Sequence, residues 1–200
     1  MFYETGQNAH GLAHDPFKAI VSPRPIGWIG SRAADGSLNL APYSFFNAIS
    51  DTPKLVMFSS SGRKDSVRNI EETGEFTANF VSHDLKDAMN MTSAPVAHGE
   101  SEFALAGLRP VEGRLVRAPF VAEAYAVLEC KVTEIFQPKA LDGSLSDSHV
   151  VIGQVVGIHI REDAIRDGRF DMAKVRPIGR MGYMDYCDAG DVFEMFRPRR

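Results

Sequence analysis

Residues 23–47 constrain the fold more strongly than any other part of this sequence. Two apolar runs flank the turn dipeptide Asp35-Gly36, and this arrangement is typical of a β-hairpin. The second run ends in residues 41–47, where aromatic rings alternate with small and hydrogen-bonding side chains. Such a segment can contact the face of a flat ring system and offer backbone groups to its edge.

The composition indicates one globular domain over residues 1–200, with 44% hydrophobic and 24% charged residues. No apolar run approaches the ~20 residues needed to span a bilayer. The N-terminus lacks the basic start and apolar core of a secretory signal. Cys130 and Cys187 form neither a disulfide framework nor a CxxC pair, so we expect a cytoplasmic protein. A net charge of −4 argues against a nucleic-acid partner.

Strand signals dominate the chain. Segments rich in β-branched and aromatic residues, bounded by Gly, Pro and Asp, predict strands at residues 19–21, 26–32, 38–41, 55–59, 76–81, 113–116, 124–136 and 149–161. Imperfect alternation around Glu129 and Lys131 predicts that one face of the seventh strand is half solvated. Many strands with few helices predict a mainly β fold built on a closed or partly closed barrel.

Two short helices interrupt these strands. Residues 65–72 place Val67 and Ile70 on one face, and Gly74 is suited to end this helix as a C-cap. Residues 84–91 show the apolar spacing of a short amphipathic helix.

Residues 59–66 are polar and cationic and are suited to bind a phosphate. Arg63 and Lys64 stand where the first helix begins. The N-terminus of a helix carries a partial positive charge, so two cations are unfavourable there. A bound anion would reverse that sign, and Ser59, Ser61 and Ser66 would add hydroxyl donors. The alternative is that Asp65 caps the helix and the cations point into water. A flat-ring segment followed by a phosphate segment favours a nucleotide-like cofactor.

The aromatic segment has its own alternative, an aromatic core strand. Proline cannot donate to a strand ladder, so Pro42, together with Asn47, disfavours a plain central strand. Neither GxGxxG nor GxxxxGK occurs, which disfavours a Rossmann cofactor domain. The histidines form no convincing metal set, and we predict no metal site. His98, Arg180 and Tyr183 lie on predicted loops and would meet a substrate or simply face solvent.

The amino-acid sequences of three segments resemble those of the FMN-binding split β-barrels of the flavin reductase-like family, including its flavoredoxin-like members. They are residues 24–29, residues 39–47, and residues 63–66 with Asn69 and Ile70. The resemblance covers about residues 12–183 and leaves residues 184–200 as a tail. It also includes residues 94–108, which are similar to the family's loop beside the flavin.

The resemblance implies a set of site residues. The segments around Trp28, Pro42 and Tyr43 would border the flavin ring. Ring-edge contacts would come from Ser44, Phe45 and Asn47, and contacts to the ribityl phosphate from Ser59, Ser61, Arg63, Lys64, Asp65 and Ser66. His98, Arg180 and Tyr183 remain the candidates for a catalytic role.

The resemblance also implies a function. We expect a homodimeric oxidoreductase that transfers hydride from NAD(P)H to FMN and electrons onward to a flavin or another acceptor, with a monooxygenase as a partner in some members. The flavin performs the hydride chemistry, so no general base need be visible. One alternative is an FMN-binding electron carrier without efficient NAD(P)H turnover. Another is a cofactor-free β-barrel interaction domain.

Overall fold

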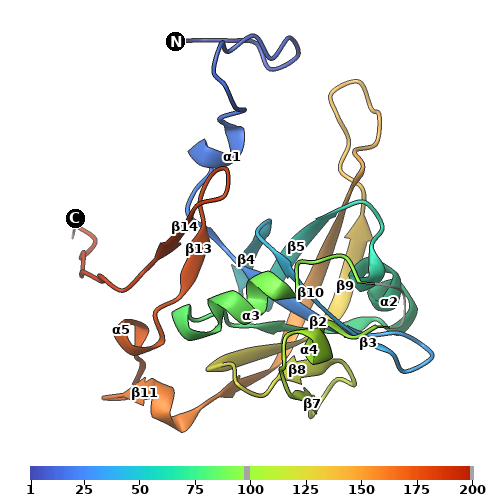
Figure 1. Ribbon diagram of the computed structural model, residues 1–200, viewed down its shortest axis with the longest axis vertical. Helices are drawn as coiled ribbons and strands as arrows, with labels where there is room; N and C mark the ends of the chain where they lie inside the picture. The colour runs from blue at the N-terminus through green and yellow to red at the C-terminus, as the bar shows by residue number, and fades with distance from the viewer. Residues whose placement is uncertain (97–99, 199–200) are drawn as a thin grey trace.

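The computed structural model describes residues 1–96 and 100–198. Its main element is an antiparallel sheet of seven strands in the order β3-β2-β6-β9-β10-β5-β4. The strands are β2 (Gly27–Arg32), β3 (Leu38–Tyr43), β4 (Phe46–Asp51), β5 (Lys54–Ser61), β6 (Glu75–Asn79), β9 (Ala126–Phe136) and β10 (Ser148–Ile160). Strands β3 and β4 form opposite edges of this sheet, yet only Ser44 and Phe45 separate them in the chain. The sheet therefore curls until its two edges approach each other (Figure 1).

Small sheets and short helices surround the main sheet. The small sheets contain β1 (Arg24–Pro25), β13 (Ile178–Arg180) and β14 (Tyr186–Asp188); β7 (Pro110–Glu112) and β8 (Pro119–Val121); and β11 (Ile165–Arg166) and β12 (Arg169–Phe170). The helices are α1 (Phe17–Ile20), α2 (Asp65–Thr73), η1 (His83–Leu85), α3 (Lys86–Met91), α4 (Glu102–Leu105), η2 (Glu162–Ala164) and α5 (Met172–Val175). No helix of the described residues is long and apolar enough to cross a membrane.

Two clusters of buried side chains hold the helices against the main sheet. One contains Trp28 and Phe103 and brings α3 and α4 toward β2 and β3. The other is aromatic: the ring of Phe58 lies 4.8 Å from that of Tyr43 and 5.6 Å from that of Phe76. Ile70 of α2 packs into this second cluster. Burial of large apolar side chains therefore fixes α2, α3 and α4 around β3.

The predicted hairpin and helix end are confirmed. Strands β2 and β3 pair across the Asp35-Gly36 turn, where Gly36 has a φ of +92° and Asp35 accepts the N–H of Ser37 at 2.9 Å. Helix α2 ends at Gly74, whose φ is +73° and whose N–H donates to the carbonyl of Ile70 at 2.8 Å. The left-handed backbone at both positions explains why glycine stands there.

The strand predicted at residues 19–21 is wrong. Phe17–Ile20 form α1 instead, because local acceptors satisfy its first N–H groups. Asp15 accepts the N–H of the first helical residue at 2.8 Å, and the carbonyl of Pro16 accepts those of Ala19 and Ile20 at 2.9 Å. Local capping thus outweighs the β-branched signal of this segment.

The strand predicted at residues 113–116 is also wrong. The backbone N–H groups of Arg114, Leu115 and Val116 donate to the carboxylate of Glu129 at 2.8, 2.6 and 3.0 Å. Glu129 is 1% exposed, although it belongs to the face predicted to be half solvated, and it also contacts the ring of His159. N–H groups that donate to a buried carboxylate are not available to a strand ladder, so this segment is a loop.

The aromatic segment is shared between two edge strands. Strand β3 continues through Pro42, which lies opposite Trp28 at the sheet edge, where its missing N–H costs no ladder bond. The sequence did not predict β4 as a strand, and its first residues, Phe46 and Asn47, pair with β5. The interruption by Ser44 and Phe45 excludes the alternative of one continuous core strand.

Candidate functional site

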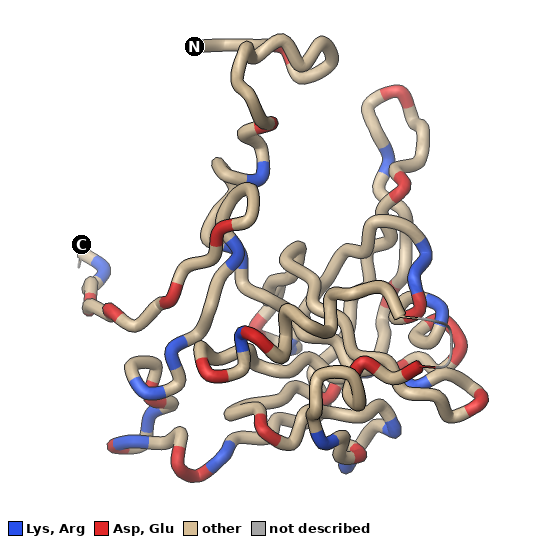
Figure 2. Tube along the Cα trace, in the orientation of Figure 1, with Lys and Arg blue, Asp and Glu red and all other residues tan. Residues whose placement is uncertain are grey.

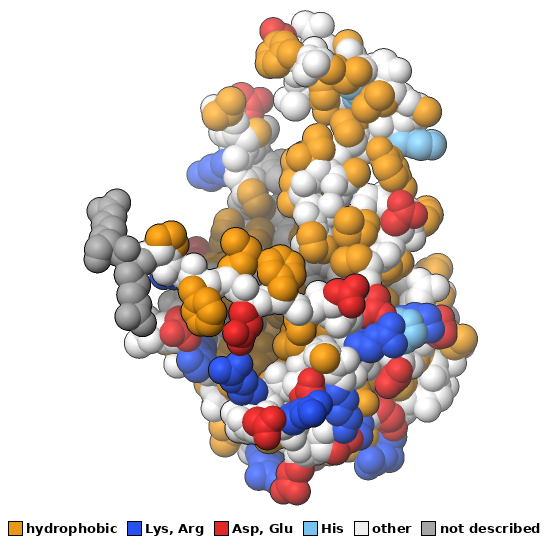
Figure 3. All heavy atoms as spheres, turned by 90° about the vertical axis from the view of Figure 1, so that its left-hand side faces the viewer, with side chains coloured by type: hydrophobic (Ala, Val, Ile, Leu, Met, Phe, Trp, Pro, Cys, Tyr) orange, Lys and Arg blue, Asp and Glu red, His pale blue; other side chains and the backbone are white. Residues whose placement is uncertain are grey.

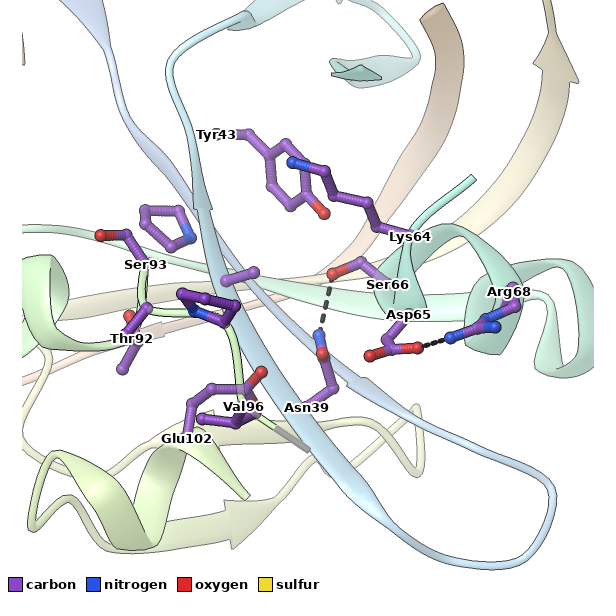
Figure 4. Close-up of a pocket in the computed structure, with 14 residues that line it drawn as sticks. Asn39, Tyr43, Lys64, Asp65, Ser66, Arg68, Thr92, Ser93, Val96 and Glu102 are labelled. Carbon is purple, nitrogen blue, oxygen red and sulfur yellow. Dashed lines mark hydrogen bonds and ion pairs between the residues drawn. The ribbon is translucent and has the colours of Figure 1, made fainter. Parts of the chain in front are cut away.

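Two adjoining cavities open beside the edge strand β3. The first has a volume of about 640 Å³ and lies between β3, the start of α2 and the segment after α3 (Figure 4). The second has a volume of about 470 Å³ and lies between the Ser44-Phe45 corner, β5, α1 and the β13–β14 turn. Both cavities are lined by Pro42, Tyr43, Lys64 and Ser93. They therefore form one continuous cleft.

Tyr43 and Lys64 lie where the two cavities meet. The ring of Tyr43 belongs to the aromatic core, and burial raises the pKa of its phenol. Figure 4 shows the Lys64 side chain reaching alongside this ring. No carboxylate among the described residues pairs with the Lys64 ammonium group. A cation without a carboxylate partner, next to an aromatic wall, is suited to an anionic ligand with a flat ring.

The start of α2 separates the two basic residues of the predicted phosphate segment. Lys64 is the N-cap residue and makes no side-chain cap, while Asp65 forms an ion pair with Arg68. Arg63 turns away from both cavities and pairs with Glu71 of the same helix at 2.6 Å. Of the two cations, only Lys64 therefore faces the cleft.

A buried polar network forms the floor of the first cavity. The carboxamide of Asn39 lies 2.8 Å from the hydroxyl of Ser66 (Figure 4). The carboxylate of Glu102 accepts the N–H of Leu40 at 3.0 Å, and burial raises the pKa of this carboxyl. These contacts tie α2 and α4 to β3 from opposite sides, so the cavity floor is held by secondary structure.

Arg24 holds the walls of the second cavity together. Its buried guanidinium donates to the carbonyl oxygens of Lys18, of Val21 at 2.5 Å and of Met181 at 2.8 Å. The same group lies 5.9 Å from the ring centroid of Phe45. Burial and the nearby Arg180 guanidinium lower the pKa of Arg24. One side chain thus connects α1, the β13–β14 turn and the corner between β3 and β4.

Most of the residues predicted for the site line this cleft. They are Pro42, Tyr43, Ser44, Phe45, Ser59, Ser61, Lys64, Asp65, Ser66, Arg180 and Tyr183. Asn47 is outside both cavities, exposed, and its Oδ1 accepts the N–H of Ala48 at 2.9 Å. His98 lies outside the described residues.

Trp28 requires a correction, because the structure places it in the core and not in the cavity wall. Its side chain is fully buried, and its indole N–H donates to the hydroxyl of Thr92 at 2.8 Å. Thr92 itself lines the first cavity. A side chain with no exposed surface cannot touch a ligand, so Trp28 supports the wall from behind.

Sequence reasoning missed several residues of the cleft. Lys18, Met89, Asn90, Thr92 and Ser93 carried no motif that would have separated them from core or surface residues. Arg24, Asn39 and Glu102 lay inside segments already singled out by the resemblance, and this could have identified them as site residues. The remaining residues reach the cleft only through tertiary packing.

Comparison with known proteins identifies the family. Residues 21–178 match the flavin reductase like domain. An uncharacterized protein of Aquifex aeolicus is 38% identical over 177 residues, which cover 85% of this chain and 86% of that protein.

Solved structures agree with this match. Nitrilotriacetate monooxygenase component B from Bacillus cereus superposes with a TM-score of 0.88 at 30% identity, covering 98% of both chains. A putative flavin reductase with a split barrel domain from Shewanella frigidimarina superposes with a TM-score of 0.81 at 24% identity, covering 98% of this chain and 94% of that one, and this confirms the predicted split-barrel fold. The chain described here is thus a member of the flavin reductase-like family.

Proposed function

We propose that this protein binds FMN in the cleft and acts as an NAD(P)H-dependent oxidoreductase of the flavin reductase type. The observation that carries this proposal is that the aromatic wall at Tyr43 meets Lys64, a cation with no carboxylate partner in the described part of the chain. Ser59, Ser61 and Ser93 add polar groups to the same cleft. This donor set fits a flat ring that carries a phosphate.

The residues of the cleft have distinct roles in this proposal. Lys64 and the nearby serines would hold the phosphate, and Ser44 with the backbone of Pro42 would meet the edge of the ring. Phe45 and Tyr183 would cover the ring and exclude water. FMN, when bound, supplies the hydride and electron transfer, while the protein contributes binding and orientation.

Assembly and partners belong to the same proposal. We infer a homodimer, because β4 is an edge strand with exposed apolar residues such as Ile49 and needs cover. We also propose that the protein is cytoplasmic. Figure 3 shows further hydrophobic side chains gathered over the upper part of one face, whereas charged side chains concentrate over its lower part. The likeness to a monooxygenase component suggests a monooxygenase as the consumer of reduced flavin.

Two measurements test the proposal. Fluorescence titration should show tighter binding of FMN than of riboflavin, and the purified protein with excess FMN should oxidise NADH or NADPH in a steady-state assay. FMN binding without NAD(P)H oxidation would favour an electron carrier, and failure to bind FMN would overturn the proposal. Sedimentation should give about twice the chain mass of 22.0 kDa. A monomer with full FMN affinity would contradict a site shared between subunits.

A further inference from the structure

The charge of the second cavity is one-sided. Four basic residues line it, namely Lys18, Arg24, Lys64 and Arg180, and no acidic residue appears among its described lining residues. Elsewhere many cations are paired with carboxylates, as Arg63 is with Glu71 at 2.6 Å, and basic and acidic positions lie close together along much of the trace (Figure 2). A concave surface lined by charges of one sign concentrates the opposite charge.

The four cations come from two separate parts of the fold. Lys64 stands at the start of α2, whereas Lys18, Arg24 and Arg180 come from α1, β1 and β13. Figure 1 shows α1 and β13 on the side of the molecule opposite to α2. FMN carries one phosphate, and in the proposed function Lys64 and the β5 serines hold it. The cations at the other end of the cavity remain without an assigned anion.

The fold fixes this second group of cations. Arg24 donates to the carbonyl oxygens of Lys18 and Met181, and so it links the segments that carry the other two cations. The β13–β14 turn packs closely on α1. This is seen at Gly182, where an added Cβ would lie 2.3 Å from the Cβ of Ala19. Arg24 therefore positions Lys18 and the Arg180 segment beside the same cavity.

Lys18 and Arg180 remain available to a ligand. No ion pair to a carboxylate is formed by either side chain among the described residues. The guanidinium of Arg180 lies 4.4 Å from the ring centroid of Tyr186 and donates to the carbonyl of Tyr183 at 2.5 Å, which fixes its orientation. Tyr183, Tyr186 and Phe45 line this end of the cavity and are at least 39% exposed. The surface beside the cations is therefore aromatic.

We propose that Lys18 and Arg180 form a second anion subsite, which binds the phosphate or carboxylate group of the ring-containing second substrate that exchanges electrons with the flavin. The inference rests on the proposed function, because it assigns the substrate class for the same cleft. The anionic group has two chemical sources: the phosphates of a nicotinamide dinucleotide donor, or the carboxylate of an aromatic acceptor.

The test uses the FMN-loaded protein and two probes, ADP-ribose for the donor and benzoate for the acceptor. Each probe is titrated while the visible flavin spectrum is recorded. The variants are the double change Lys18→Gln, Arg180→Gln, the opposite-end change Lys64→Gln, and Lys139→Gln as a control at an exposed lysine of the β9–β10 connection. FMN affinity and thermal unfolding are measured for each protein beforehand.

A defined pattern is expected. At least one probe perturbs the wild-type spectrum, and its Kd rises about tenfold or more in the double variant, as for loss of charge-assisted hydrogen bonds. FMN affinity falls in Lys64→Gln but changes little in the double variant, and Lys139→Gln matches wild type in both. Which probe responds identifies the source of the anion.

Other outcomes overturn the inference. Equal probe affinity in the wild type and the folded double variant, or no response to either probe in the FMN-loaded wild type, excludes the second subsite while leaving the proposed function intact. A wild-type protein that fails to bind FMN removes the proposed function and this inference together. The FMN titration thus separates the two failures.

Discussion

The indole N–H of Trp28 donates to the hydroxyl of Thr92 at 2.8 Å, and that hydroxyl donates in turn to the carbonyl of Met89 at 2.7 Å. This chain of two bonds joins the core of the barrel to the wall of the cleft, because Thr92 lines the first cavity while Trp28 is fully buried.

Replacement of Thr92 by valine should therefore lower stability. The isosteric side chain leaves the buried indole N–H without an acceptor, which costs about 1–3 kcal/mol. Urea unfolding of Thr92→Val should show this loss. In a Trp28→Phe background the same change should cost much less, because no indole N–H remains, and an equal cost in both backgrounds would contradict the assignment.

Lys64 and Arg63 should differ in their effect on FMN binding. Lys64→Ala removes a cation that faces the cleft, so FMN should bind more weakly by about 1.5–3 kcal/mol, or roughly tenfold or more. Arg63→Ala should have a smaller effect, because Arg63 is paired with Glu71 and turned away. Riboflavin, which lacks the phosphate, should bind both variants like wild type. Equal losses of FMN affinity in the two variants would refute this distinction.

Glu129 should make stability depend on pH. Burial raises the pKa of this carboxyl, but the N–H groups of Arg114, Leu115 and Val116 and the ring of His159 lower it more, so the pKa of folded Glu129 lies below its ordinary value. The unfolded state then binds more protons, and the stabilisation is complete above the unfolded pKa of about 4.3. It is lost as the pH falls through the folded pKa.

Urea unfolding between neutral and acidic pH tests this expectation for Glu129. The wild type should lose stability below about pH 4.3, and Glu129→Gln should be less stable at neutral pH with a flatter acid profile. Glu134→Gln, at an exposed position on the same strand, is the matched control and should follow the wild type. Parallel profiles for wild type and Glu129→Gln would show that this carboxylate contributes nothing.

Gly182→Ala should separate α1 from the β13–β14 turn. The added Cβ would lie 2.3 Å from the Cβ and 2.7 Å from the Cα of Ala19, so the backbone has to move. Overpacking of this kind costs about 1–3 kcal/mol. Gly6→Ala is the control, since nothing lies within 4 Å of its added Cβ. Thermal unfolding should distinguish the two, and equal melting temperatures would argue against tight packing of this turn.

The sequence predicted those parts of the fold that depend on contacts between neighbouring residues, and it failed where contacts join residues far apart in the chain. The β2–β3 hairpin and the end of α2 follow from Asp35-Gly36 and Gly74, because the backbone geometry of a turn or cap is decided locally. The error at residues 113–116 arose from Glu129, which lies more than ten positions away and was placed on a half-solvated face. No local pattern reveals that a carboxylate will be buried and hydrogen-bonded by the N–H groups of a distant loop.

In the candidate site, too, local sequence predicted some residues correctly, whereas the position of others depends on tertiary packing. Lys64, Ser59 and Tyr43 were predicted from the sequences of their segments, and all three line the cleft. Arg63 had the same local signal as Lys64, but it pairs with Glu71 and does not line the cleft. Which of two adjacent cations lines a cavity depends on side-chain packing, which a local sequence pattern does not specify.

The position of β3 at the sheet edge limits how its backbone can recognise a ligand. In an antiparallel strand, the N–H and C=O groups of alternate residues point away from the paired neighbour. On the outer side of β3, the N–H of Leu40 is already bound to Glu102, and Pro42 has none. The edge therefore presents carbonyl acceptors next to the cavity, and these would suit a ligand with an N–H on its rim. Because main-chain atoms provide this pattern, side-chain substitutions elsewhere along β3 would alter the shape of the site but not its acceptors, whereas replacement of Pro42 would add an N–H donor to the edge.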